Sequence, residues 1–567
     1  MASLEVASKL GTYHPSPSLR ELTMRNLTDI ASALGLAPNE YHPAGPSALK
    51  VPVSVVRARA AKKSSGKLIL ITGMTPTKHG EGKTVTAIGL ADGLNRIQKS
   101  AVVCLRQPSL GPVFGVKGGA TGGGKSTVEP SDEINLGFTG DIHAVAAAHN
   151  LLTALIENHI FHGNPLKIDP QKILWPRTMD MEDRALRHIR VANGHDPRFV
   201  PHDSLFVITA ASEVMVVLAL SRDYADLKAR LGRIVAALTV DGKAVRASDL
   251  KAAGAMAALL RDALEPNLVQ TQEGTPALVH TGPFGNLAHG TCSRLSIELG
   301  LATCEYTVVE AGFATELGAE KFVDIVTTNL GRNVDAAVLV ATQRGLRFQG
   351  GASDEESGKS NRSALERGLE NLAQHLDNME TFGVSAVVAL NHFPGDTKEE
   401  AEVVRRFCQA RGVEVVEAKG FAEGGKGTVD LARAVVAAAK LGRQSHPVSP
   451  PGTPIFDQVD AIATRLYGAS HVNRTPEALL DLQLLERISE TTGPVCVAKT
   501  PLSLSDNPHV VGRPRDFNVT VERLTRSAGA GFTVAYLGTI ETMPGLPTRP
   551  AAEEIDLTAD GKVVGVH

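Results

Sequence analysis

The sequence predicts an α/β protein with one large domain built on a mostly parallel sheet, followed by two smaller α/β domains. A buried strand, a glycine-containing turn, a helix and a second strand follow one another within residues 67–105. Further apolar runs of strand length alternate with helical patterns in the rest of the chain. Because a helix that connects two neighbouring strands returns the chain to the same end of the sheet, this alternation is typical of parallel sheets.

Composition and charge exclude several classes of function. The 567 residues are 43% apolar and 21% charged, so the chain can bury a large core. The 58 Lys and Arg residues nearly balance the 61 Asp and Glu residues, and only 4% of the chain is aromatic. Nucleic-acid binding needs excess positive charge and stacking rings, so no nucleic-acid partner is expected. Glycine is in excess, with 54 residues, and gathers in a few short clusters.

Cysteine spacing and hydropathy predict the compartment. The five cysteines lie far apart and form no C-x-x-C pair, which argues against a zinc site or a disulfide framework and fits a reducing compartment. The N-terminal residues lack the apolar segment of a secretory signal. The most apolar window, Leu205 to Leu220, is interrupted by Ser212 and Glu213 and is too short to cross a bilayer. We therefore expect a cytoplasmic protein with no membrane partner.

The first elements of the chain lead into the sheet. Helical periodicity extends over residues 21–34 and ends where prolines become frequent. A buried strand is predicted over 67–72, with a turn that begins at Gly73. An Ala- and Leu-rich pattern then predicts a helix over 83–96, and the apolar run 101–105 predicts the second strand.

Later elements repeat the alternation, and two segments interrupt it. The polar segment 350–360 and the proline-rich segment 445–454 predict domain boundaries, which divide the chain into residues 1–350, 351–450 and 451–567. Further strands are predicted over 205–210, 306–309, 336–340, 386–390 and 413–416, and helices over 366–376, 398–410 and 429–439.

A phosphate-binding loop is predicted between the first strand and its helix. Such a loop needs glycines that turn backbone N–H groups inward, a Lys that reaches the outer phosphates and a hydroxyl that binds Mg²⁺. The usual first glycine is Thr77 here, so a chance Gly-Lys-Thr before a surface helix is the alternative. The motif predicts a P-loop NTPase-like large domain that binds ATP, with Mg²⁺ held through Thr84. The ATP-binding residues would be Thr77, Lys78, His79, Gly80, Glu81, Gly82, Lys83 and Thr84.

Arg106 opens a second glycine-rich segment. It comes directly after the strand 101–105, and glycines recur from Gly111 to Gly124. Ligands of α/β sheets bind at the carboxyl ends of the strands, and we expect this strand to lie next to the phosphate loop. A guanidinium there can bind a carboxylate or phosphate through two hydrogen bonds. An ordinary ion pair and a flexible glycine loop are the alternative.

Four further polar residues are weaker candidates. Asp141 and His143 follow a Thr-Gly pair and could lie near a metal or phosphate, although a helix cap is the more common role. Glu213 interrupts an apolar run and Glu310 follows the strand predicted at 306–309. Either carboxylate could hold a cation, and a structural hydrogen bond is the equally weighted alternative.

Two phenylalanines follow predicted strands. Phe393 lies in the loop after the strand 386–390, and Phe421 lies in the loop after the strand 413–416. In a chain with few aromatic residues they could stack on a flat ligand, and packing in the protein interior is the alternative.

Taken together, these segments resemble the formate–tetrahydrofolate ligase family, also called formyltetrahydrofolate synthetase. The resemblance begins near Ser47 and extends to the C-terminus, and its many long motifs occur in the order typical of the family. The motifs are Thr77–Thr84, Arg106–Pro112, Gly115–Gly124, Ile134–His143, Asp262–Gln270, Gly282–Gly290, Glu310–Phe313, Leu317–Phe322, Pro494–Thr500, Ser503–Asp506 and Met543–Pro547.

The resemblance implies that formate and MgATP give formyl phosphate and ADP, and that N10 of tetrahydrofolate then takes the formyl group. It implies that Lys83 and Arg106 are catalytic, with Arg106 binding formate and formyl phosphate. It also implies that Phe393 and Phe421, in the 351–450 domain, hold the pterin between them. The family further implies a homotetramer that a monovalent cation, K⁺ or NH₄⁺, stimulates. No dinucleotide-binding fingerprint precedes these motifs, so a monofunctional ligase is expected.

Two other functions fit part of the sequence. A divergent ligase could form an acyl phosphate with a different acceptor, and it would turn over ATP with formate but without folate. A nucleotide-dependent ATPase that binds partner proteins could use the same phosphate loop. That reading assigns no role to residues 115–124 or to the later motifs.

Overall fold

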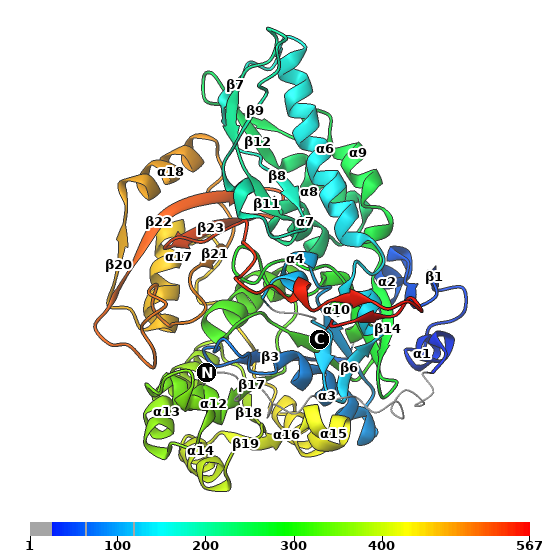
Figure 1. Ribbon diagram of the computed structural model, residues 1–567, viewed down its shortest axis with the longest axis vertical. Helices are drawn as coiled ribbons and strands as arrows, with labels where there is room; N and C mark the ends of the chain where they lie inside the picture. Colours follow the sequence, from blue (N-terminus) through cyan, green and yellow to red (C-terminus); the bar gives the residue numbers. More distant parts are fainter. Residues whose placement is uncertain (1–24, 63–64, 117–119, 567) are drawn as a thin grey trace, which may run out of the picture.

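The computed structural model describes residues 25–62, 65–116 and 120–566. The described part is mixed α/β, with one large sheet at its centre and several smaller sheets around it (Figure 1). Of the helix expected over 21–34, the described part contains α1 (Leu27–Ala33), and the expected residues before 25 lie outside the described ranges. None of the described helices combines the length and hydropathy that crossing a membrane requires.

Seven parallel strands form the middle of the large sheet. Their order is β15-β4-β16-β3-β17-β18-β19, and β14 (Asn267–Thr271), β2 (Ala48–Lys50) and β1 (His42–Ala44) extend it as antiparallel strands. The short strand β6 (Ser126–Glu129) pairs with β14, and β5 (Gly122–Gly123) pairs with β6. The parallel strands are β15 (Pro276–Val279), β4 (Ala101–Leu105), β16 (Tyr306–Glu310), β3 (Lys67–Gly73), β17 (Ala336–Thr342), β18 (Ala386–Asn391) and β19 (Glu414–Ala418).

The expectation that β4 lies next to the strand of the phosphate loop is wrong. β16 lies between them and pairs in parallel with both β3 and β4. Strands that follow one another in sequence usually pair, which favours β3 next to β4. Here β16, which begins about 200 residues after β4, is inserted between them. The strand predicted at 205–210 is also shorter than expected, because β11 (Phe206–Ile208) passes directly into a 3₁₀ turn.

The apolar residues of β3 alternate between two cores. Ile69 and Ile71 pack with α3 (Lys83–Arg96) and α16 (Val429–Ala439) on one face of the sheet. Leu68 and Leu70 pack on the opposite face with α2 (Val53–Ala60) and α10 (Arg294–Thr303). Successive strand residues point to opposite faces, so a strand covered on both sides is apolar throughout. The helices predicted over 83–96, 398–410 and 429–439 are confirmed with those bounds.

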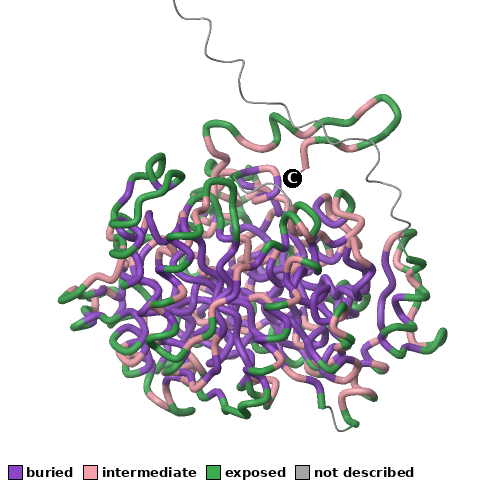
Figure 2. Tube along the Cα trace, turned by 90° about the horizontal axis from the view of Figure 1, so that it is seen from below, coloured by how far each residue is buried: buried purple, intermediate pink, exposed green. Residues whose placement is uncertain are grey.

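Two lobes surround the large sheet. In the upper part of Figure 1, four helices accompany the three-stranded sheet β13-β12-β7. The helices are α6 (Asp141–Phe161), α7 (Glu213–Leu220), α8 (Tyr224–Arg233) and α9 (Ala253–Leu259), and the strands are β13 (Ala244–Arg246), β12 (Val235–Thr239) and β7 (Ile168–Ile173). On the left, α17 (Ile455–Ile462) and α18 (Pro476–Arg487) accompany a four-stranded C-terminal sheet of order β20-β22-β23-β21. Its strands are β20 (His471–Arg474), β22 (Asn518–Ser527), β23 (Phe532–Leu537) and β21 (Val495–Ala498). Figure 2 shows the buried trace gathered in the interior, whereas residues 551–566 near the C-terminus are half-buried or exposed.

Candidate active site

The carboxyl ends of the parallel strands converge on one region of the molecule. The phosphate loop follows β3, and Arg106 follows β4. Glu310, Thr342 and Asn391 are the last residues of β16, β17 and β18. Since parallel strands end at the same edge of a sheet, five segments distant in sequence supply one site.

The phosphate loop has the backbone that its glycines allow. Gly80 and Gly82 both have a φ of +74°, and Gly82 is the N-cap residue of α3. A Cβ added at Gly82 would lie 2.9 Å from Asn391 Nδ2, so this position has neither the conformation nor the space for a side chain. Thr77 does not have a positive φ, so a threonine can stand where the usual loop has a glycine. The Thr77 carbonyl oxygen accepts a hydrogen bond from Gly80 N at 3.3 Å.

Glu81 fixes the loop from inside the protein. Its buried carboxylate accepts hydrogen bonds from Thr77 N at 2.8 Å and from the Thr342 hydroxyl at 2.5 Å. Asn391 Nδ2 donates to the Glu81 carbonyl oxygen at 2.8 Å. The Glu81 side chain is therefore directed into the protein and holds the loop to β17 and β18. On the solvent-exposed side of the loop, His79 Nε2 lies 2.7 Å from Asp354 Oδ1.

Lys83, Arg106 and Glu310 form the charged centre of the site. Burial lowers the pKa of Lys83, and the negative charges of Glu310 and Glu81 oppose this effect. Burial also lowers the pKa of Arg106, and Glu310 again opposes it. The Thr84 hydroxyl donates to Glu310 Oε2 at 2.8 Å. Two half-buried cations near one carboxylate can bind a polyanion and a small acid together.

Phe393 and Phe421 both line one cleft of about 1460 Å³. The two residues are 37% and 60% exposed, so interior packing, the alternative named for each of them, is wrong. Phe421 lies in α15 (Gly420–Glu423), where Lys125 N donates to its carbonyl oxygen at 2.9 Å. This contact attaches the Phe421 loop to the glycine-rich segment. Exposed rings in a cleft of this size are available to stack on a flat ligand.

The other candidates of the sequence have structural roles or lie elsewhere. Asp141, at the start of α6, accepts hydrogen bonds from Lys50 Nζ at 3.0 Å and Asn267 Nδ2 at 2.7 Å. Glu213 accepts from the backbone of Gly529 at 2.6 Å. These two carboxylates connect elements of the fold and do not contribute to the charged centre.

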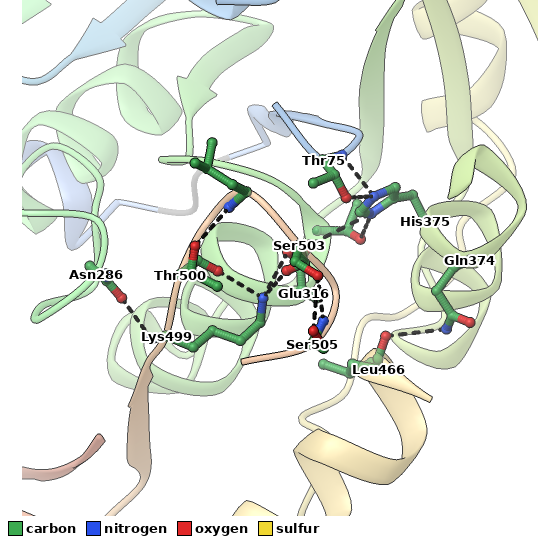
Figure 3. A network of polar contacts seen from close by, with 12 residues as sticks. Thr75, Asn286, Glu316, Gln374, His375, Leu466, Lys499, Thr500, Ser503 and Ser505 are labelled. Carbon is green, nitrogen blue, oxygen red and sulfur yellow. Dashed lines mark hydrogen bonds and ion pairs between the residues drawn. The ribbon is translucent and has the colours of Figure 1, made fainter. Parts of the chain in front are cut away.

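A buried polar network includes Thr75, which lies between β3 and the phosphate loop (Figure 3). Thr75 N donates to His375 Nε2 at 2.8 Å, and burial lowers the pKa of His375 to about 4, which keeps the ring neutral. Glu316 lies between His375 and Lys499, with its carboxylate oxygens 3.6 Å from Nδ1 and 3.5 Å from Nζ. Lys499 N donates to Asn286 Oδ1 at 3.0 Å. The network thus connects the start of the phosphate loop with the C-terminal sheet.

Lys499→Met should lower the free energy of unfolding by about 3 kcal/mol, because it leaves the fully buried Glu316 carboxylate without its cation. Burial lowers the pKa of Lys499 to about 8, so the ammonium form still predominates at neutral pH. Chemical denaturation of the wild type and the variant measures the loss. The double variant Lys499→Met/Glu316→Leu, which removes both charges, should recover most of it. A double variant as unstable as the single one would contradict the charge-pair explanation.

Sequence reasoning missed several residues that shape the site. Glu81 was expected to contact the nucleotide with the rest of its loop, yet its carboxylate is directed inward. Thr342, Asn391 and the Glu316–Lys499 pair were not singled out. The position of Asn391 at a strand end, directly before His-Phe-Pro, was a usable signal.

Comparison with known proteins gives matches over nearly the whole chain. A sequence model of the family described as formate–tetrahydrofolate ligase matches residues 18–567. A formate–tetrahydrofolate ligase from Paracoccus denitrificans is 48% identical over 547 residues, 96% of this chain and 98% of the relative. One from Thermus thermophilus is 49% identical over 540 residues, 95% of this chain and 98% of the relative. One from Thermotoga petrophila is 48% identical over 543 residues, 96% of this chain and 100% of the relative.

Proposed function

This chain belongs to the formate–tetrahydrofolate ligase family, and from that premise we propose how its site joins formate to tetrahydrofolate. The enzyme is an ATP-dependent ligase that forms a carbon–nitrogen bond. It converts formate, ATP and tetrahydrofolate into 10-formyltetrahydrofolate, ADP and phosphate.

The arrangement of Lys83, Glu310 and Arg106 is the observation that supports this site most strongly. Glu310 ends β16, the strand between those that lead to Lys83 and Arg106. A carboxylate substrate and a triphosphate repel each other, so their reaction needs cations that bind both. Lys83 suits the transferring phosphoryl group, and Arg106 suits the carboxylate of formate.

We divide the reaction into two steps. A formate oxygen attacks the γ-phosphorus of ATP, the bond to the bridging oxygen breaks, and ADP leaves with the electron pair. N10 of tetrahydrofolate then attacks the carbonyl carbon of formyl phosphate, phosphate leaves, and N10 loses its proton. In both steps Arg106 would hold the one-carbon unit, and the amides of the phosphate loop with Lys83 would stabilise the charge on the phosphoryl oxygens.

Magnesium would enter this site with ATP. The Thr84 hydroxyl and the Glu310 carboxylate are 2.8 Å apart and are oxygen ligands of the type that Mg²⁺ prefers. Within the described ranges no three His, Cys, Asp or Glu side chains group together as a metal site. When bound, Mg²⁺ offsets the charge of the phosphates. A monovalent cation, K⁺ or NH₄⁺, is a further proposal taken from the family.

The pterin of tetrahydrofolate would stack between Phe393 and Phe421, which line the same cleft. Phe421→Ala should weaken tetrahydrofolate binding by about 10- to 100-fold, in line with the ~1–3 kcal/mol that stacking on an aromatic side chain contributes. Fluorescence or calorimetric titration with tetrahydrofolate measures the change, and ATP affinity should stay constant. Phe199→Ala, which removes another exposed ring outside the cleft, is the matched control. An unchanged folate affinity in Phe421→Ala would remove this residue from the folate site.

A coupled assay tests the whole function. ADP release should require formate, and 10-formyltetrahydrofolate should appear only when formate, ATP and tetrahydrofolate are all present. ATP turnover that depends on formate but ignores folate would instead indicate a different acceptor. Absence of formate-dependent ADP release would refute the ligase assignment.

The wider organisation is also a proposal. We propose a P-loop NTPase-like large domain over residues 1–350, a domain over 351–450 that supplies the folate site, and a third over 451–567. The second is joined closely to the first, because β18 and β19 continue the sheet that contains β3. We further propose a cytoplasmic enzyme that assembles as a homotetramer, as the family implies.

A further inference from the structure

The cleft that contains Phe393 and Phe421 follows α3 from one end of the helix to the other. At the N-terminal end, a Cβ added at Gly82 would lie 4.0 Å from Phe393 Cζ. At the C-terminal end, Asn95 and Arg96 line the same cleft. The 14 residues of α3 span about 20 Å at 1.5 Å per residue. A pterin is only two fused rings long, so the cleft has room for the rest of a folate molecule.

Two lysines line this cleft close to the Phe421 loop. Lys125 N donates to the Phe421 carbonyl oxygen at 2.9 Å, and a Cβ added at Gly424 would lie 3.4 Å from the Lys125 carbonyl oxygen. Lys426 lies in the 3₁₀ helix Gly424–Thr428, which directly follows α15. Both lysines are exposed. The segments that hold the Phe421 ring therefore also present two ammonium groups to a ligand in the cleft.

Cations outnumber the carboxylates that are available to balance them. Glu273 Oε2 already pairs with Arg96 Nε at 2.9 Å. Asp92 is 1% exposed, and burial raises its pKa to about 7, so it carries only part of a negative charge at neutral pH. Glu423 is then the one remaining carboxylate among the lining residues that the structure describes. It stands against three cations that form no ion pair in the described part of the chain, namely Arg25, Lys125 and Lys426.

We propose that Lys125 and Lys426 bind the carboxylates of the glutamate tail of tetrahydrofolate, so that the enzyme selects folates whose tail is ionised. The inference rests on the proposed function and names two specificity-determining residues for it. The tail carries two carboxylates, each of which accepts hydrogen bonds and attracts a cation. A lysine is a flexible point charge, which suits a tail that rotates about several single bonds.

The position of Lys426 along α3 fits a tail that extends away from the reacting nitrogen. N10 must reach the formyl group held by Lys83 and Arg106, so it lies toward the N-terminal end of α3. A Cβ added at Gly425, the residue before Lys426, would lie 2.6 Å from Asp92 Cβ. Asp92 follows Lys83 by nine residues, or about 14 Å along the helix. The p-aminobenzoyl group separates N10 from the glutamate, and the reach of a lysine side chain covers the rest of this distance.

Binding of tetrahydrofolate and of its diamide, in which both tail carboxyls are neutral amides, tests the proposal with MgADP present. The wild type should bind tetrahydrofolate about 5- to 30-fold more tightly, because the diamide loses two exposed charge pairs. Lys125→Ala/Lys426→Ala should lose this preference and keep the wild-type affinity for the diamide, since the aromatic rings are unchanged. Lys125→Arg/Lys426→Arg retains both charges and should keep the preference.

Lys243→Ala is the matched control. Lys243 is an exposed lysine that pairs with Asp241 at 2.8 Å outside this cleft, so its loss should leave the preference unchanged. If Lys125→Ala/Lys426→Ala preferred tetrahydrofolate as strongly as the wild type, the tail assignment would be overturned. A loss of MgATP affinity in this double variant, with the folate preference kept, would show that the lysines bind nucleotide and not the tail.

Ionic strength gives a second readout on the wild type alone. The preference for tetrahydrofolate over the diamide should decrease as the salt concentration rises, because exposed charge pairs are screened. A preference that salt does not change, or equal binding of the two ligands at low salt, would overturn the proposal. A wild type that binds neither ligand, while still turning over ATP with formate, would instead refute the folate function on which the proposal depends.

Discussion

Lys83→Ala should reduce formate-dependent ADP formation by about 1,000-fold or more. Lys83 is the first residue of α3, and its ammonium lies within reach of the charges of Glu310 and Arg106. In the proposed mechanism Lys83 stabilises the transferring phosphoryl group, and loss of one such group typically costs 10²–10³ in rate or more. Rapid quench of ADP and formyl phosphate measures the first step directly.

Lys99→Ala is the matched control for this substitution. Lys99 follows α3, is partly exposed and pairs with Glu305 at 2.8 Å. Its loss should leave the rate unchanged, because exposed ion pairs contribute little and Lys99 is distant from the strand ends. Circular dichroism should show that both variants keep their fold. If Lys83→Ala formed formyl phosphate at the wild-type rate, Lys83 would have no part in phosphoryl transfer.

Arg106→Ala should lower kcat/KM for formate by about 100- to 1,000-fold while ATP affinity changes little. Arg106 Nη1 donates to the Pro283 carbonyl oxygen at 3.2 Å, which orients the guanidinium at the end of β4. Formate is too small to bind through apolar contacts, so a paired hydrogen bond to one cation supplies most of its binding energy. Initial rates at varied formate and fixed MgATP measure the effect.

Arg106→Lys and Arg190→Ala complete this experiment. Lysine keeps the charge but not the planar pair of donors, so Arg106→Lys should recover only part of the loss. Arg190 forms an exposed pair with Asp203 at 3.0 Å, and its replacement should have no kinetic effect. An increase in KM for ATP alone, with formate kinetics unchanged, would show that Arg106 binds nucleotide and not formate.

Local patterns were sufficient to predict the strands and helices around the phosphate loop. The helix over 83–96 and the strand over 101–105 have the predicted bounds, because each is an uninterrupted apolar pattern between clear turn signals. The order of the strands could not be predicted in the same way. Pairing of β16 with both β3 and β4 depends on contacts between residues about 200 positions apart, and no local pattern records them.

The residues of the candidate site also divide into those that local patterns predict and those that depend on contacts between distant segments. Lys83 and Arg106 follow strands directly, so periodicity and a motif were enough to single them out. Glu81 has a role that depends on which segment packs against it, here the end of β17. The sequence around such a residue does not show which distant segment will pack against it, so its role can be recognised only in the folded structure.

The insertion of β16 between β3 and β4 has a consequence for synthesis of the chain. A nascent chain that has not yet reached residue 306 contains the phosphate loop and Arg106 but lacks the strand that separates them. Pairing of β3 with β4 at that stage would have to be undone when β16 arrives. High sequence separation between paired strands slows folding. We therefore expect the sheet edge that carries the phosphate loop and Arg106 to assemble only after β16 has been synthesised.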